Sequence, residues 1–120
     1  MLYSNTRALT ARQIDEWMKD SGQFIVVDAR NATAFTEGFI PGSLFIGYGE
    51  HFVEWAINLL DSDEKIILVT PPGKEEACIG LLEHAGFKAN VAGYLEGGFE
   101  TWRDAGKAID MIIEVDAGEL

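Results

Sequence analysis

The sequence predicts an α/β domain built on a mostly parallel β-sheet. The stretches QFIVVDAR and EKIILVT, at residues 23–30 and 64–70, each contain a continuous apolar run, which is typical of central strands buried on both faces. Segments with apolar residues at helical spacing lie before, between and after these runs. Because strands alternate with helices over short connections, we expect a parallel sheet with ligand sites at the carboxyl ends of its strands.

The first helix is predicted at residues 10–20. Thr10 and Gln13 match a capping box, in which each side chain accepts a hydrogen bond from the backbone N–H of the other residue. Ile14 and Trp17 then fall on one helical face, which is expected to pack on the sheet.

The middle of the chain predicts two more helices with a strand between them. Asn31 is a candidate N-cap and Gly38 a candidate end for the first of these helices. The segment IPGSLFIG, at residues 40–47, turns through Pro41 and Gly42 into the strand. Helical spacing predicts an apolar core face for the second helix at Phe52, Trp55, Ala56, Leu59 and Leu60.

The C-terminal part predicts a helix, a strand and a final helix. Residues 74–86 form the first helix, which ends at Gly86. Residues 89–95 form the last strand, and residues 97–106 the last helix.

Composition and charge exclude several classes of partner. The 120 residues carry a net charge of −11, which argues against binding to nucleic acid or to anionic membrane surfaces. No apolar run approaches the roughly 18 residues of a membrane span, and the N-terminus shows no apolar signal segment. The single cysteine cannot form an internal disulfide, and we expect a cytoplasmic protein.

Two short motifs lie near the ends of predicted strands. In the first, a strand ends at Asp28, Arg30 follows, and a turn comes at residues 38–42, with Pro41 and Gly42. Asp28 and Arg30 are expected to tie loops together by ion pairing and hydrogen bonds.

The second motif places two glycines before an aromatic residue. Gly97 and Gly98 follow Leu95, and Trp102 follows them as an anchor. The glycines suit a tight turn from strand to helix. In this order and spacing, the two motifs and the loop after residue 69 resemble the rhodanese family, and the resemblance covers nearly the whole chain. It implies a central, mostly parallel sheet with helices on both faces.

The resemblance also implies where a catalytic cysteine would lie. Active members of the family place it directly after the strand that matches residues 66–69, in a loop of backbone N–H groups. This chain has a threonine there, and its vestigial loop is Thr70, Pro71, Pro72, Gly73, Lys74, Glu75 and Glu76. A hydroxyl cannot carry a transferable sulfur, prolines lack N–H donors, and the two glutamates are expected to oppose an anionic substrate. We therefore expect no catalytic residue in this domain.

Cys78 is the only cysteine and lies inside a predicted helix. At 100° per residue, Ala77, Cys78, Leu81, Leu82 and Ala85 share an arc of roughly 140°. Cys78 is therefore expected to pack in the core as a small hydrophobic residue.

Other candidate residues favour structural roles. His51 and His84 lack the ligand spacing of a metal site, so we expect exposed histidines, no metal and no cofactor. Trp17, Trp55 and Trp102 follow helical spacing and are expected to be core anchors.

The sequence is most similar to degenerate rhodanese domains attached to metallo-β-lactamase-fold hydrolases, including persulfide dioxygenase-like proteins of sulfur metabolism. This similarity implies a non-catalytic module of a larger protein, with the metal in another domain. One alternative is a free-standing protein-binding or regulatory module. A second is a divergent sulfurtransferase that uses Cys78. The sequence gives no indication of the oligomeric state.

The predicted domain boundary lies near residue 110. Residues 1–110 form the rhodanese-like domain, and residues 111–120 a linker and the start of a following domain. Residues 116–120 repeat the capping-box pattern of residues 10–14, about one domain length later.

Overall fold

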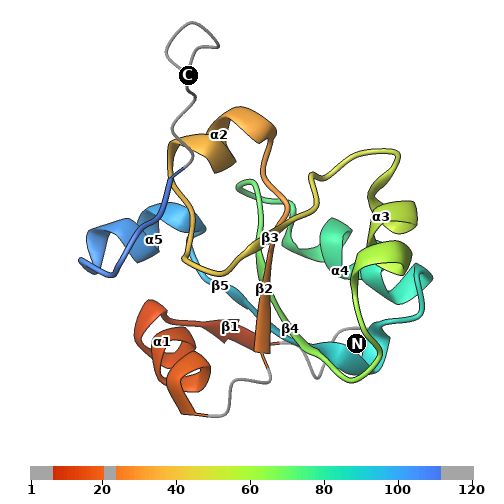
Figure 1. Cartoon of the computed structure of the whole chain (residues 1–120), viewed down its shortest axis with the longest axis horizontal. Helices are drawn as coiled ribbons and strands as arrows, with labels where there is room; N and C mark the ends of the chain where they lie inside the picture. Colours follow the sequence, from red (N-terminus) through yellow and green to blue (C-terminus); the bar gives the residue numbers. More distant parts are fainter. Residues whose placement is uncertain (1–6, 21–23, 112–120) are drawn as a thin grey trace, which may run out of the picture.

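The computed structural model describes residues 7–20 and 24–111 of the chain. A five-stranded sheet in the order β1-β5-β4-β2-β3 forms its centre, and all four strand pairs are parallel (Figure 1). The strands are β1 (Arg7–Leu9), β2 (Phe24–Asp28), β3 (Leu44–Phe45), β4 (Lys65–Val69) and β5 (Val91–Leu95). The helices are α1 (Ala11–Asp20), α2 (Ala32–Glu37), α3 (Phe52–Leu59), α4 (Glu75–His84), α5 (Phe99–Asp104) and the short 3-10 helix η1 (Lys88–Asn90). The predicted α/β fold is confirmed.

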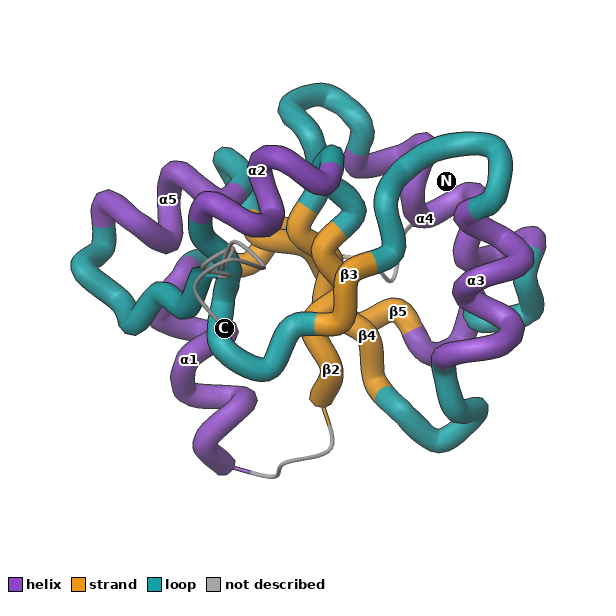
Figure 2. Tube along the Cα trace, turned by 45° about the horizontal axis from the view of Figure 1, so that its top comes forward, coloured by secondary structure: helices purple, strands orange, loops and turns teal. Residues whose placement is uncertain are grey.

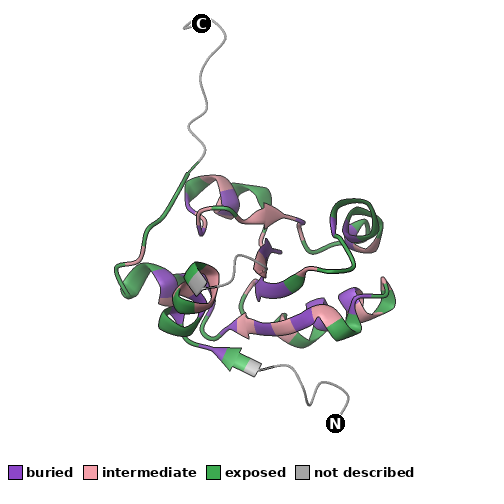
Figure 3. Ribbon diagram, turned by 60° about the horizontal axis from the view of Figure 1, so that its bottom comes forward, coloured by how far each residue is buried: buried purple, intermediate pink, exposed green. Residues whose placement is uncertain are grey.

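Helices cover both faces of the sheet (Figure 2). Ile66 and Leu68 of β4 pack with α3 and α4 on one face, whereas Ile67 and Val69 pack with α1 and α5 on the other. Because successive side chains of a strand point to opposite faces, a central strand in such a sandwich must be apolar throughout. Figure 3 shows the resulting burial along the central strands.

The caps that the sequence predicts at the starts of α1 and α2 and at the end of α4 are present. The backbone N–H of Thr10 donates to Oε1 of Gln13 at 2.9 Å, and the N–H of Gln13 donates to Oγ1 of Thr10 at 3.1 Å. Asn31 caps α2, since its Oδ1 accepts a hydrogen bond from the N–H of Ala34 at 2.8 Å. Gly86 follows the end of α4 with a φ of +96°, a conformation that favours glycine.

The predicted core face of α3 is partly wrong. Phe52, Ala56 and Leu60 are buried, but Trp55 is 55% exposed and Leu59 is 44% exposed. The helix packs on the sheet through one narrow stripe, so residues on either side of that stripe remain in solvent. Trp55 is therefore not a core anchor.

The other two tryptophans lie in the apolar layer around α1 and α5. Trp102 is buried, and Trp17 is half-buried with its ring stacked on Phe24 at a centroid distance of 5.1 Å. In α4 the buried stripe is also shifted from the prediction, because Ala77 is exposed and Ile79 is buried beside Cys78.

Strand β1 is absent from the sequence prediction. It has only three residues and pairs with β5 at the edge of the sheet, with Leu9 beside Leu95. Three residues are too few to show a strand periodicity.

The predicted start of a following domain lies at residues 116–120, outside the described residues.

Within the described ranges, no helix has the length and apolar character needed to cross a bilayer.

Candidate functional site

The loop after β4 lies at the carboxyl edge of the sheet and closes as a tight turn. The N–H of Lys74 donates to the carbonyl of Pro71 at 3.1 Å, and Gly73 has a φ of +78°. Proline at the second position and glycine with positive φ at the third are the residues of a type II turn. Helix α4 begins directly afterwards, at Glu75. The loop is therefore shaped by the sequence Pro-Pro-Gly-Lys.

Thr70 occupies the junction between β4 and this turn. Its residue surface is 2% exposed, and it lines a cavity of about 260 Å³. The residues around this cavity include Arg30, Pro72, Gly97, Gly98, Glu100 and Arg103. The loop therefore presents a threonine at the place where β4 meets the cavity.

A second cavity, of about 330 Å³, adjoins the first, and Arg30, Ala34 and Pro72 line both. Its other side is formed by Tyr48 and Lys74, whose Nζ lies 5.7 Å from the ring centroid of Tyr48.

The charges around the two cavities differ from the sequence-based expectation. Among the described residues, Glu75 and Glu76 line neither cavity, whereas the carboxylate of Glu100 lines the first. Three basic side chains also line them: Arg30, Lys74 and Arg103. The described residues of the cavity walls therefore lack the expected excess of negative charge.

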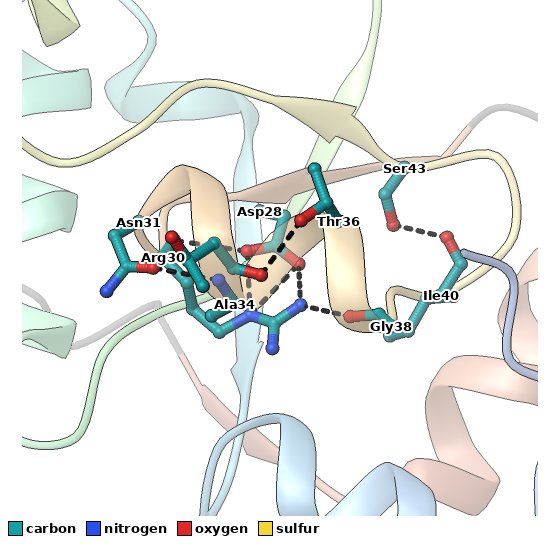
Figure 4. A network of polar contacts seen from close by, with 9 residues as sticks. Asp28, Arg30, Asn31, Ala34, Thr36, Gly38, Ile40 and Ser43 are labelled. Atoms are coloured by element: carbon teal, nitrogen blue, oxygen red, sulfur yellow. Dashed lines mark hydrogen bonds and ion pairs between the residues drawn. The ribbon is translucent and has the colours of Figure 1, made fainter. Parts of the chain in front are cut away.

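Arg30 is held by a network of polar contacts at the end of β2 (Figure 4). Its Nη2 lies 2.7 Å from Oδ2 of Asp28, and its Nε lies 2.9 Å from Oδ1. The same Nη2 donates to the carbonyl of Gly38 at 2.6 Å. The guanidinium also lies over the ring of Phe99, with Cζ 4.3 Å from its centroid. Arg30 thus joins β2, the end of α2 and α5.

The turn after Gly38 has the same design as the loop after β4. Pro41 and Gly42 occupy its centre, Gly42 has a φ of +85°, and the N–H of Ser43 donates to the carbonyl of Ile40 at 3.0 Å. The Ser43 hydroxyl donates to the same carbonyl at 2.6 Å. The turn leads the chain directly into β3.

The double-glycine motif forms the turn between β5 and α5. Gly97 has a φ of +81° and Gly98 a φ of +74°, so both residues adopt conformations that favour glycine. Trp102 lies in α5, 3% exposed, and its Nε1–H donates to the carbonyl of Ala108 at 2.7 Å. The ring therefore anchors α5 and the segment that follows it.

Cys78 lies away from both cavities. Its side chain is fully buried in the core between the sheet, α3 and α4. Burial raises the pKa of its thiol to about 12, with the negative charge of Glu75 adding to the effect and Lys74 opposing it. At neutral pH the thiol is protonated and enclosed, and both conditions suppress its nucleophilicity.

This environment predicts slow alkylation of Cys78 in the folded protein. We expect iodoacetamide to react at least about 100-fold more slowly in native buffer than in denaturant, because access and thiolate are both lacking. The rate is measured by mass spectrometry, with free glutathione as the control for the reagent. Similar rates in both states would contradict the burial of Cys78.

The histidines lie on the surface. His51 contacts Glu54, with Nδ1 3.2 Å from Oε1, and His84 is exposed at the end of α4. Within the described residues, no group of three or more His, Cys, Asp and Glu side chains could hold a metal ion.

Some residues of the site gave no signal in the sequence. Arg103 and Tyr48 belong to segments distant from the loop, and only the packing of α5 and of the chain before α3 brings them to the cavities. The sequence likewise gives no signal for Phe99, whose ring lies beneath the guanidinium of Arg30. An adjacent glycine pair and a nearby buried tryptophan do not reveal which residue of α5 faces the loop.

The fold and the two adjoining cavities define an α/β domain with a candidate binding site at the carboxyl ends of its strands. The sequence model of the Rhodanese-like domain family matches residues 10–105, and the chain therefore belongs to that family. No curated protein matches the sequence.

Solved structures show the same fold at low sequence identity. The Alr3790 protein from Anabaena sp. is 23% identical, with a TM-score of 0.77 over 88% of this chain and 94% of that one. The BH2092 protein from Bacillus halodurans is 21% identical, with a TM-score of 0.72, and the match covers 88% of this chain and 77% of that one. A thiosulfate sulfurtransferase from Pseudomonas aeruginosa is 23% identical, with a TM-score of 0.68, and covers 88% of this chain but 20% of its own.

Proposed function

We propose that this rhodanese-like domain is a non-catalytic module that acts through binding. The observation that carries the proposal is the position of its sulfur: the only cysteine of the chain is fully buried in the core and lies at neither cavity. Where active relatives carry the nucleophilic cysteine, this chain has Thr70. A threonine oxygen cannot form a persulfide, so sulfur transfer has no acceptor at this site.

The loop also supplies fewer donors than a sulfur cradle requires. Pro71 and Pro72 have no N–H, and the N–H of Lys74 is already bonded to Pro71 within the turn. Removing one hydrogen-bond donor from an oxyanion hole costs roughly 2.7–4 kcal/mol in an enzyme that depends on it. A loop without these donors therefore favours binding over catalysis.

A sulfurtransferase assay tests this proposal. We expect the protein to transfer no sulfur from thiosulfate to cyanide above a protein-free blank, under conditions in which an active rhodanese turns over. Turnover that is lost in a folded Cys78→Ala variant would contradict the proposal and would favour the divergent sulfurtransferase that uses Cys78.

Thr70→Cys is the second arm of the same test. We expect its activity to stay at least about 100-fold below that of an active rhodanese, because the two prolines still remove donors from the loop. Thr70→Ser is the matched control without a thiol. Substantial activity in Thr70→Cys would show that the loop still binds the sulfur donor productively.

We further propose that the module works inside or beside a larger protein of sulfur metabolism, of the metallo-β-lactamase-fold class. The support is the resemblance of the segments LVTPPGKEEA and GYLEGGFETW to the degenerate domains of such proteins. The complete reading frame tests this assignment: a neighbouring segment with an H-x-H-x-D-H motif would support it, and its absence would favour a free-standing module.

A further inference from the structure

Helix α3 exposes an unusual number of large apolar side chains. The structure places six such side chains on the surface of the described residues, and three of them lie within five positions of α3: Trp55, Ile57 and Leu59. Trp55 and Ile57 are more than half exposed, and Leu59 is 44% exposed. A tryptophan in solvent exposes a large apolar surface to water, and an apolar patch rimmed by polar residues is typical of an interaction site.

The geometry of α3 places two of these side chains together. At 100° per residue, Trp55 and Leu59 are neighbours on the helix surface, whereas Ile57 lies on the opposite flank of the buried stripe. That stripe is formed by Phe52, Ala56 and Leu60, which hold the helix on the core. Trp55 and Leu59 therefore project from a helix that is firmly seated.

Carboxylates flank α3 at both ends. Glu50 and Glu54 lie around its first turn, and Asp61, Asp63 and Glu64 follow its last turn. Four of the five are exposed, and Glu64 is half-buried. In the described part of the chain, no lysine or arginine forms an ion pair with any of them, whereas the ring of His51 lies 3.5 Å from Oε1 of Glu50 and 3.2 Å from Oε1 of Glu54.

The turn after α3 has a defined shape, which places these charges. The side-chain amide of Asn90 donates to the carbonyls of Ser62 and Glu64, both at 2.7 Å. The N–H of Asp61 donates to Oε1 of Glu64 at 3.0 Å. A rigid turn holds the acidic side chains next to the end of the helix.

We propose that this α3 surface, made of Trp55, Leu59 and the five flanking carboxylates, docks a basic amphipathic helix of a partner protein. The apolar side chains of such a helix would pack against Trp55 and Leu59, and its lysines and arginines would meet the carboxylates at either end. Helix α3 has 8 residues, about 12 Å, so two to three turns of a partner helix would span it.

Charge selects this partner over the alternatives. A second copy of the chain would bring like carboxylates face to face, and an anionic membrane would be repelled in the same way. Residues 1–6, 21–23 and 112–120 of this chain contain no lysine or arginine, so they cannot supply the complementary charge. A basic segment satisfies both the apolar centre and the acidic ends.

The probe is a synthetic peptide of about 14 residues, with a leucine stripe on one helical face and lysines near both ends. A scrambled peptide of the same composition has the same charge but no stripe. Isothermal titration calorimetry measures both affinities, and amide chemical shifts locate the contact. We expect the striped peptide to bind about tenfold more tightly than the scrambled peptide, with shifts centred on α3.

Matched variants separate the α3 surface from general attraction between opposite charges. The double variant Trp55→Ser, Leu59→Ser is expected to weaken binding of the striped peptide by about tenfold or more. Met111→Ser, at a residue that is 53% exposed elsewhere, should change it less than about twofold. The double variant Glu54→Gln, Asp61→Asn should bind the striped peptide more weakly than the wild type does. Added salt should reduce this difference in affinity between the variant and the wild type.

Several outcomes would overturn the proposal. These are equal affinity for the two peptides, no effect of the double variant, shifts centred away from α3, dimerisation of the wild type that the double variant abolishes, or binding of the protein to anionic vesicles. Sulfur transfer at the loop and peptide binding at α3 are measured separately, so failure of one result leaves the other standing.

Discussion

Replacing Arg30 with methionine is expected to lower the free energy of unfolding by about 3–5 kcal/mol, which is the usual cost of leaving a buried charge without its partner. Asp28 is fully buried and makes its side-chain ion pair with Arg30, whose own side chain is 11% exposed. The substitution also removes the hydrogen bond to Gly38 and the contact with Phe99. Urea denaturation followed by circular dichroism measures the change.

The chain offers a matched control in an exposed ion pair. Arg12 and Glu16 lie 3.2 Å apart on α1, with side chains 83% and 62% exposed, and Arg12→Met should cost no more than about 0.5 kcal/mol. A double variant, Asp28→Leu with Arg30→Met, should recover part of the stability because no buried charge is left alone. Equal small losses for Arg30→Met and Arg12→Met would show that the Asp28–Arg30 pair does not hold the site together.

Truncating Trp102 to alanine is expected to cost about 3–5 kcal/mol, the range for removing a large aromatic side chain from a core. Trp102 is 3% exposed, and its ring projects from α5 into the apolar layer that packs on the sheet. Its indole N–H donates a hydrogen bond to the carbonyl of Ala108. Its loss would leave a cavity and free the segment after α5. Thermal and chemical denaturation measure the loss.

Trp55 provides the control for this prediction. The same change at Trp55, which is 55% exposed, should alter the free energy of unfolding by no more than about 0.5 kcal/mol. Trp102→Phe keeps most of the apolar volume but removes the hydrogen bond to Ala108, so it should cost about 1 kcal/mol beyond the change in packing. A Trp102→Ala variant as stable as Trp55→Ala would contradict the role of Trp102 as an anchor.

The sequence by itself determined the elements whose signals are local. The reciprocal hydrogen bonds of Thr10 and Gln13, the Asn31 cap and the glycine that ends α4 involve residues only a few positions apart, so their chemistry can be read directly from the chain. The apolar runs of β2 and β4 were equally clear, because a strand covered on both faces tolerates few polar side chains. The burial of Cys78 also followed from helical spacing.

Only the tertiary structure decided which apolar residues are covered. Trp55 and Trp102 both follow helical spacing, yet one is exposed and the other buried, because α3 packs through a narrow stripe whereas the ring of Trp102 lies between α5 and the sheet. Strand β1 exists only because β5 offers an edge to pair with. Arg103 lines a cavity only because α5 packs close to the loop after β4. Periodicity shows that a face is apolar, but what covers that face depends on how elements distant in the sequence pack together.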